Sequence, residues 1–143
     1  MTRIVLDTNV LVSGMINAFG APGRIVDLLR EGYLQLVVDD RILAEYAAVL
    51  NRAKFRPYFT AKDARDILLF LEYNSHYTVA TVHLAGLPDP NDRSFLEVAL
   101  SAAVPLVTGN VAHFPPDRCS GCEVLVPAAF LRSFRAPDKD GAD

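Results

Sequence analysis

Long apolar runs are missing from this sequence, and so is a basic segment followed by an apolar one near the N-terminus. We therefore expect neither a membrane-spanning helix nor a secretory leader, and we place the protein in the cytoplasm. Low-complexity tracts are also missing, and a content of 51% hydrophobic and 22% charged residues is typical of a folded soluble chain. A net charge of only −3 argues against a surface that binds nucleic acid indiscriminately, but it is compatible with a local basic rim around an acidic site.

Cysteine is scarce. The two cysteines, Cys119 and Cys122, are spaced C-x-x-C in the Pro- and Gly-rich segment 115–122. Such a pair can be half of a zinc site, a redox pair or two reduced thiols in a surface loop. A structural zinc needs four ligands, and His113 is the only further candidate nearby. Redox pairs normally open a helix, whereas this pair lies in a turn, so we favour reduced thiols.

The length of 143 residues fits one domain with a substantial core and is too short for two ordinary domains. We place this domain at residues 1–134. Residues 135–143 are rich in proline, glycine and charge, so we expect them to form a flexible tail without a function.

Three short runs rich in Val, Leu and Ile, at residues 4–6, 34–38 and 105–107, have the composition of buried strands. Helical patterns lie between them, which is typical of parallel βαβ construction. Two further strands are predicted at residues 77–82 and 123–126. The sequence therefore predicts an α/β fold around a mostly parallel sheet of about five strands.

Helices are predicted from apolar spacing and from residues that begin helices. Residues 40–54 have helical spacing, with Asp39 or Asp40 as the N-cap, and residues 60–74 begin with a capping box formed by Thr60 and Asp63. The apolar stripes of these two helices exceed what a small surface helix needs, so we also predict a homodimer.

Further helices are expected at both ends of the chain and before the third apolar run. Thr8 and Asn9 can open a helix directly after the first strand. Asp92 follows a proline-rich turn and precedes an apolar helical run, and Pro127 can open a last helix through Phe134.

Acidic side chains come at the junctions between these elements. Asp7 ends the first strand, Glu45 lies on the helix 40–54, and Asp89 and Asp92 lie at or just before a helix N-terminus. Asn110 follows the strand 105–107. Ligands of open α/β sheets bind beyond the carboxyl ends of the strands, and a carboxylate there needs a reason, because burying a charge is costly.

If these carboxylates converge, their mutual repulsion requires a positive partner, and a hard divalent cation is the natural one. Magnesium and manganese prefer carboxylate and water oxygens, so the expected chemistry is phosphodiester hydrolysis at an Mg²⁺ or Mn²⁺ site. Each acid taken alone also has a structural explanation, because Asp39, Asp40, Asp63, Asp89 and Asp92 are of a residue type that caps helices and forms turns.

Four motifs in order resemble those of PIN-domain nucleases. They are DTNVLVSG at residues 7–14, the helix with Glu45, DPND with FLEVA at residues 89–99, and VTGN with HFP at residues 107–115. The resemblance covers about residues 3–130 and is greatest to the branch of VapC-like ribonucleases regarded as toxins of toxin-antitoxin systems. It implies a three-layer α/β/α sandwich and a metal-dependent ribonuclease.

The same resemblance assigns roles to the candidate residues. Asp7, Glu45 and Asp92 match the three family acids, and Asp89 matches an additional acid of this branch. Asn110 stands where many relatives carry a fourth acid, which lowers the charge of the site by one and weakens the case for two metal ions. Supporting roles are expected for Thr8, Asn9 and Thr108, which offer hydroxyl and amide groups at the same edge of the sheet.

The remaining polar residues give weaker signals. His113 and Phe114 match a family pattern, but we expect them to pack their loop, and we expect His76 and His83 to be structural or exposed. A rim that guides RNA phosphates can be drawn from the basic residues, although charges on helix faces are usually only solvated. The candidates are Arg24, Arg41, Arg52, Lys54, Arg56 and Lys62.

Three functions compete. The first is an endoribonuclease toxin whose partner is a cognate antitoxin that blocks the acidic site. The second is a phosphohydrolase of the haloacid-dehalogenase type, which expects an aspartate two residues after its nucleophile, where this chain has Asn9. The third is a PIN-like module that binds RNA or a partner without cutting, and it is favoured by Asn110 but not by the presence of Asp7, Glu45 and Asp92.

Overall fold

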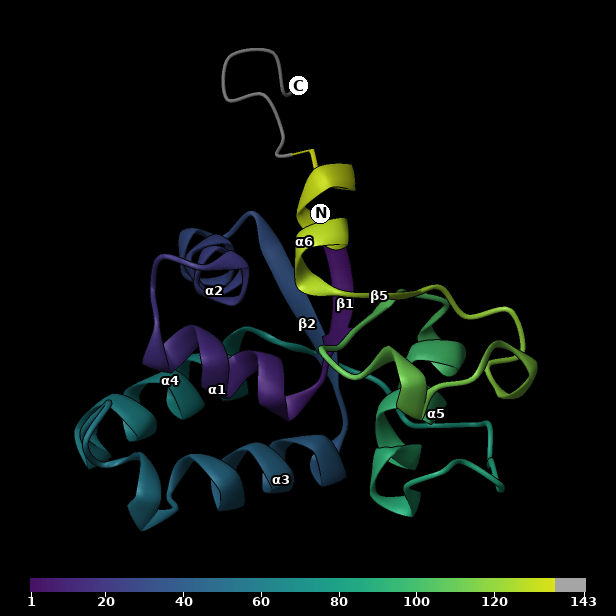
Figure 1. The fold of residues 1–143 in the computed structure, drawn as a ribbon, viewed down its shortest axis with the longest axis horizontal. Helices are drawn as coiled ribbons and strands as arrows, with labels where there is room; N and C mark the ends of the chain where they lie inside the picture. The colour runs from purple at the N-terminus through teal and green to yellow at the C-terminus, as the bar shows by residue number, and fades with distance from the viewer. Residues whose placement is uncertain (136–143) are drawn as a thin grey trace.

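Five short parallel strands form the centre of the molecule in the computed structural model, which describes residues 1–135 (Figure 1). The strands are β1 (Thr2–Leu6), β2 (Leu34–Val38), β3 (His76–Tyr77), β4 (Leu106–Val107) and β5 (Val124–Leu125). Their order in the sheet is β3-β2-β1-β4-β5, and every neighbouring pair is parallel. The predicted α/β fold with about five strands is confirmed. The tail predicted at residues 135–143 lies outside the described residues except for Arg135.

Six helices cover the two faces of the sheet in the described part of the chain. They are α1 (Thr8–Ile16), α2 (Ala21–Glu31), α3 (Asp40–Leu50), α4 (Ala61–Asn74), α5 (Arg93–Ala102) and α6 (Pro127–Ser133). Because parallel crossovers are right-handed, the steps from β1 to β2 and on to β3 put α1–α4 on one face, and the return to β4 puts α5 on the other. Figure 1 shows this division, with α1, α2 and α4 to the left of β1 and β2, α3 below them and α5 to the right, so the three-layer sandwich is confirmed.

The strand order reverses beside β1, and this reversal decides where the functional residues meet. The register pairs Val5 with Leu106 and Leu6 with Val107. The next residues along the two strands are Asp7 and Thr108, so their side chains leave the sheet next to each other. The backbone N–H of Asp7 continues the ladder by donating to the carbonyl of Val107 at 2.9 Å. Crevices at such reversals are the usual ligand sites of open α/β sheets.

The predicted strand at residues 77–82 is wrong over most of its length. Only His76 and Tyr77 pair with β2, and the N–H of Thr78 makes a last bond to the carbonyl of Val38. The chain then turns toward α5, because the N–H of Thr81 donates to the hydroxyl of Ser101 at 2.9 Å. Residues 78–87 therefore form an irregular connection across the end of the sheet.

Other boundaries also differ from the predictions. The helix expected at residues 40–54 ends at Leu50, and a short 3-10 turn follows at Ala53–Phe55. Three more 3-10 turns lie at Pro90–Asp92, Val111–His113 and Pro116–Arg118. The capping box predicted for Thr60 and Asp63 is present at the start of α4. None of the helices within residues 1–135 has the length and apolar character needed to cross a membrane.

The helix α2 lies close to α1 at Gly14 and close to the connection between the two helices at Gly23. A Cβ atom added to Gly14 would lie 2.6 Å from Cγ2 of Val26 and 2.7 Å from the carbonyl oxygen of Pro22. A Cβ atom on Gly23 would lie 2.4 Å from the carbonyl oxygen of Ala18. Glycine at these two positions is therefore what lets α1 pack against α2 and hold the beginning of α1, where Thr8 lies.

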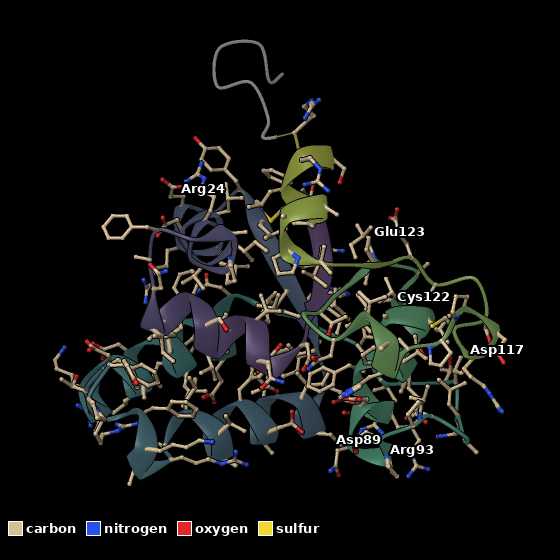
Figure 2. All side chains as sticks on the ribbon, viewed as in Figure 1. Arg24, Asp89, Arg93, Asp117, Cys122 and Glu123 are labelled. Atoms are coloured by element: carbon tan, nitrogen blue, oxygen red, sulfur yellow. The ribbon has the colours of Figure 1, made fainter. Side chains whose placement is uncertain are left out.

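The two cysteines are unpaired and lie in the loop between β4 and β5. Cys119 is buried and its thiol donates to the carbonyl of Phe114, while Cys122 is half-buried. Figure 2 shows Cys122 in this loop, well apart from Asp89. Cys119 is more buried than a surface loop suggests.

Candidate metal centre

The acidic residues converge in one cavity at the carboxyl edge of the sheet. Its volume is about 230 Å³. Polar and charged residues from four segments line it, namely Asp7, Thr8, Asn9, Glu45, Arg52, Asp89, Asn91, Asp92, Asn110 and His113. All the residues that the sequence singles out as ligands or supports are therefore here, with Thr108 directly behind Asp7.

Asp7 lies at the bottom of this cavity and is held by the neighbouring strand. Its side chain is buried, and the fully buried hydroxyl of Thr108 donates to its Oδ2 atom at 2.7 Å. The same hydroxyl accepts the backbone N–H of Asn110 at 3.0 Å, which fixes its direction. One oxygen of Asp7 is thus oriented by β4, and the expectation of a supporting contact from Thr108 agrees with this geometry.

Glu45 reaches the cavity from α3, and two contacts fix that helix. The Asp39 carboxylate accepts the N–H of Ile42 at 3.0 Å and caps the helix. The hydroxyl of Tyr46 donates to the carbonyl of Leu6 at 2.6 Å and ties α3 to the end of β1. The Glu45 carboxylate then accepts a short hydrogen bond from the hydroxyl of Thr8, so α1 and α3 together orient it.

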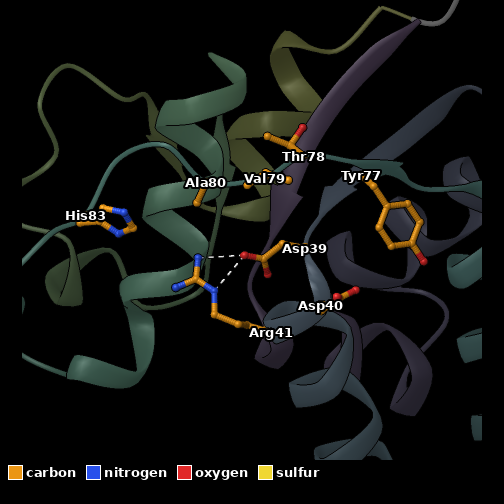
Figure 3. Close-up of a pocket in the computed structure, with 8 residues that line it drawn as sticks. All are labelled: Asp39, Asp40, Arg41, Tyr77, Thr78, Val79, Ala80 and His83. Carbon is orange, nitrogen blue, oxygen red and sulfur yellow. Dashed lines mark hydrogen bonds and ion pairs between the residues drawn. The ribbon is translucent and has the colours of Figure 1, made fainter.

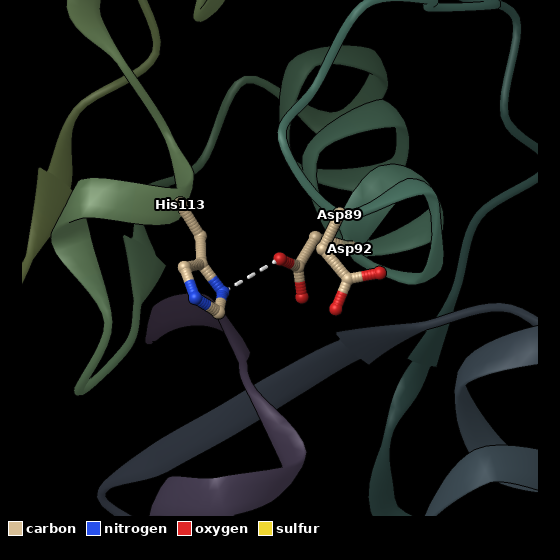
Figure 4. Close-up of side chains that lie close together, drawn as sticks. All are labelled: Asp89, Asp92 and His113. Carbon is tan, nitrogen blue, oxygen red and sulfur yellow. Dashed lines mark hydrogen bonds and ion pairs between the residues drawn. The ribbon is translucent and has the colours of Figure 1, made fainter.

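Asp89, Asp92 and His113 form a tight group at the opposite wall. One ligand atom from each of the three lies within 4.8 Å of the others, and Asp92 Oδ2 is 3.0 Å from His113 Nδ1. Figure 4 shows the imidazole facing both carboxylates from the loop after β4. Asp89 also caps the turn Pro90–Asp92 by accepting the N–H of Asn91 at 2.9 Å, so its structural and functional explanations both hold.

The surroundings of Asp92 oppose the ionisation of its carboxyl group. Burial together with the nearby charges of Asp7 and Asp89 raises the pKa of its carboxyl to about 6, even though His113 acts in the opposite direction. A carboxyl whose ionisation is opposed in this way gains from a cation placed among its neighbours. The donors are carboxylates, an amide oxygen and an imidazole, and this set fits a divalent ion such as Mg²⁺ or Mn²⁺.

Two residues that line the cavity, His113 and Arg52, have positions that the sequence does not predict in detail. His113 was expected only to pack its loop, yet its ring contacts Asp92, whereas its neighbour Phe114 is fully buried as expected. Arg52 is the one basic candidate among those named that lines the cavity within residues 1–135. Arg52 follows the end of α3 and comes directly before the 3-10 turn Ala53–Phe55.

The described residues do not bring every acid into one tight ligand group. Asp7 and Glu45 line the cavity, but the group within 4.8 Å comprises only Asp89, Asp92 and His113. Asp39 and Asp63, which were weighed as caps, do cap α3 and α4 and lie outside the cavity lining. The geometry thus separates acids with a capping role alone from acids that face a common space.

Comparisons with known proteins agree with this architecture. The sequence profile of the PIN domain matches residues 3–112. An uncharacterized protein of Methanocaldococcus jannaschii is 27% identical over 110 residues, which make up 76% of this chain and 70% of that protein. VapBC-1 from nontypeable Haemophilus influenzae has a similar fold with a TM-score of 0.55 and 16% identity, covering 89% of this chain and 99% of that one.

Two further solved structures share the fold. VapBC2 from Rickettsia felis, bound to a DNA fragment from its promoter, has a TM-score of 0.53 at 16% identity and covers 86% of this chain and 97% of that one. A domain of a functionally unknown protein from Methanocaldococcus jannaschii has a TM-score of 0.53 at 14% identity, covering 97% and 95%. At these identities the likeness concerns the fold alone.

Proposed function

The chain belongs to the PIN-domain family, and from this premise we propose that it is a metal-dependent endoribonuclease that hydrolyses RNA phosphodiesters in the acidic cavity. The observation that carries the proposal is the convergence of Asp7, Glu45, Asp89 and Asp92 from three separate segments into one space. Because each carboxylate repels the others, such a cluster is costly unless it holds a cation. The family also removes the haloacid-dehalogenase alternative.

The roles of the residues follow from their contacts. Asp7, Glu45, Asp89 and Asp92 would hold Mg²⁺ or Mn²⁺, and Asn110 would add a neutral oxygen. Such an ion supplies activation of a water molecule and neutralises charge on the phosphate. Thr108 orients Asp7, Thr8 orients Glu45, and His113 holds one oxygen of Asp92. Asn9 lies exposed at the cavity, where its amide can contact the substrate.

We further propose that the protein is the toxin of a toxin-antitoxin pair and acts in the cytoplasm. The support is the resemblance of its motifs to VapC-like toxins, together with structural neighbours in VapBC assemblies. An antitoxin segment that covers the cavity would then silence it. A homodimer remains part of this proposal, and its test is given below.

Cleavage of an RNA panel tests the proposal. Purified protein and its Asp7→Asn variant are incubated with single-stranded and structured RNAs in Mn²⁺, Mg²⁺ or EDTA. We expect cleavage that needs metal and is lost in the variant by at least about a hundredfold, because the change removes a charge without changing the shape. Circular dichroism of both proteins checks that the fold is kept, and the variant also controls for contaminating nucleases.

A folded protein that is as inert as Asp7→Asn on every RNA would refute the nuclease. The binding-module alternative would then gain, since Asn110 leaves the cavity one charge short of the family pattern. In that case metal binding by calorimetry, without cleavage, separates a module that keeps the ion from one that has lost it.

A further inference from the structure

A second cavity opens at the same edge of the sheet, beyond the carboxyl ends of β2 and β3. It has a volume of about 370 Å³ and is lined by residues 39–41, residues 77–80 and His83 (Figure 3). We call it the β2–β3 cavity. Nothing in the proposed chemistry uses it, although it lies at the edge where α/β sheets bind ligands.

Arg41 stands in the wall of this cavity and is fixed by two carboxylates. Its Nε and Nη2 atoms lie 2.9 and 2.8 Å from Asp39 Oδ2, and its Nη1 atom lies 2.8 Å from Glu97 Oε1. Its side chain is nonetheless 49% exposed. Since a guanidinium has five N–H donors, one on Nη1 and one on Nη2 remain available to a ligand.

Glu97 is a buried acid that the acidic cavity does not use. Only 3% of its side chain is exposed, and it also accepts the N–H of Leu84 at 2.8 Å. Burial alone would raise the pKa of Glu97, but the hydrogen bonds from Leu84 and Arg41 lower it, so the carboxylate stays charged. Burying a charge is costly. Here the buried carboxylate of Glu97 holds Arg41 rigidly at the cavity wall.

The β2–β3 cavity lies next to the candidate metal centre. Arg41 and Glu45 are four residues apart on α3, so they share one side of the helix at a separation of about 6 Å along its axis. This is comparable with the spacing of neighbouring nucleotides in an extended single strand. A strand with its scissile phosphate at Glu45 can therefore place an adjacent nucleotide at Arg41.

The charges around the cavity decide which part of a nucleotide fits. Asp39, Asp40 and Glu97 outnumber Arg41, so the surroundings repel a phosphate. The remaining lining is largely apolar and includes Tyr77, Val79 and Ala80. Apolar walls with a planar guanidinium are the surroundings in which proteins bind an unstacked base.

We propose that the β2–β3 cavity binds the base of one RNA nucleotide next to the scissile phosphate, with Arg41 as the residue that contacts the base. This inference rests on the proposed ribonuclease function and adds a specificity site to it. The Asp39–Arg41–Glu97 contacts then serve to orient the guanidinium toward that base.

Abasic scanning of a bound oligonucleotide tests this. The Asp7→Asn protein, which binds without cutting, is titrated in Mn²⁺ with a fluorescent single-stranded octaribonucleotide and with versions that lack one base at a time. We expect one position at which loss of the base weakens binding by about fivefold or more, the lower end for a base stacked in a protein site.

The same scan is repeated with Ala80→Leu, which fills the cavity, and with Arg41→Lys, which keeps the charge but loses the planar fork. Both changes should abolish the dependence on that one base and leave binding of the matching abasic RNA unchanged. Ala61→Leu, an exposed position at the start of α4, is the matched control and should keep the full dependence. Thermal unfolding checks that each variant is folded, and calorimetry checks that its Mn²⁺ binding equals that of the Asp7→Asn parent.

Several results would overturn the inference. One is base dependence that survives Ala80→Leu, and another is a uniform loss of affinity at every position. A free nucleoside monophosphate that competes as strongly as the intact strand would assign the cavity to a free nucleotide instead. Failure of the ribonuclease proposal is recognised separately, because the unaltered protein would then cut no RNA of the panel, whether or not it binds one.

Discussion

Asp92 combines three conditions that seldom occur at one carboxyl group: burial, two acidic neighbours and an imidazole at 3.0 Å. Their balance raises the pKa of Asp92 from 3.8 to about 6. A proton and a metal ion therefore compete for the same oxygens. Metal affinity should rise with pH through this range, because only the ionised form is a good ligand.

The raised pKa also predicts how the metal-free protein responds to pH. Because the folded state binds the proton of Asp92 more tightly than the unfolded state, this group stabilises the fold below about pH 4, and that contribution is lost as the pH rises through about 6. The Asp92→Asn variant lacks the titration. In EDTA we expect the variant to gain stability relative to the parent between pH 4 and 7, measured by urea unfolding at each pH.

A constant difference in unfolding free energy across that pH range would contradict the assignment of the shift to Asp92. Addition of Mn²⁺ should reverse the order at pH 7, because the parent then gains binding energy that the variant lacks.

Arg52 offers the cavity a cation that no described residue pairs with through its side chain. It is exposed, lines the cavity and lies just after the end of α3. We expect Arg52→Ala to weaken RNA binding and to reduce the dependence of log affinity on log salt by about 0.7, the value for one contact to a single-strand phosphate. Fluorescence anisotropy at several salt concentrations measures both.

The matched control is Arg65→Ala, which removes an exposed cation from α4, outside the cavity lining. If the two variants lose the same slope, the contribution of Arg52 is only to the general charge of the surface.

At the scale of single residues, the sequence points to functional candidates where a residue type is unusual among its neighbours. Asp7 is singled out because an acid that ends an apolar strand needs an explanation, and Asp92 because it opens a helix next to Asp89; both line the acidic cavity. The contact of His113 with Asp92 and the place of Arg52 at the cavity are not predicted, because they depend on how the loop after β4 and the segment after α3 run in space. Glu97 is missed for a different reason, because an acid on a helix is predicted to be solvent-exposed unless its partner, here Arg41, is known.

At the scale of the elements, close packing around α1 and α2 restricts two positions to glycine. The spaces at Gly14 and Gly23 are filled by Val26 and by the backbone at Pro22 and Ala18. We expect Gly14→Ala to destabilise the protein by about 1–3 kcal/mol, because the added methyl group must displace backbone. Chemical denaturation measures the loss.

Gly109→Ala is the natural comparison, since a Cβ atom there has nothing within 4 Å and the residue has an ordinary φ. It should change stability by less than about 0.5 kcal/mol. An equal loss from both substitutions would mean that the α1–α2 approach is looser than its distances suggest.

Helices with clear beginnings were predicted best. The capping box at Thr60 gave α4 its start, and Pro127 gave α6 its start, because these signals are local. The strand at residues 77–82 was overpredicted, because its fate depends on the distant Ser101 and Glu97. The helix α2 was not predicted, although Pro22 in its first turn and Gly32 at its end, with φ of 83°, are standard boundary residues.

At the scale of the whole molecule, the expected homodimer needs an interface other than the apolar stripe of α4 on which its prediction is based. The apolar stripe of α4 is largely used inside the protomer, since Ile67 and Leu71 are buried in the core. The exposed face of the same helix presents Leu69 and Tyr73, which are 46% and 83% exposed. These two residues are the apolar candidates for an interface on this helix.

Sedimentation velocity tests the dimer. We expect the parent to sediment as a dimer and the double change Leu69→Ser and Tyr73→Ser to sediment as a monomer, because the exchange removes the exposed apolar contact and leaves the core untouched. A parent that is monomeric at all concentrations would refute the homodimer, and a dimer that persists in the variant would place the interface elsewhere.

The hydrogen bond from Thr108 to Asp7 joins residues 101 positions apart, and His113 comes later still. A chain that is being synthesised therefore exposes its first acid long before the residue that orients it has been translated. Since domains fold as units, the cavity is assembled only when little of the protein remains to be made. Under the proposed function, the acidic cavity that would cut RNA is therefore not assembled while most of the chain is still being translated.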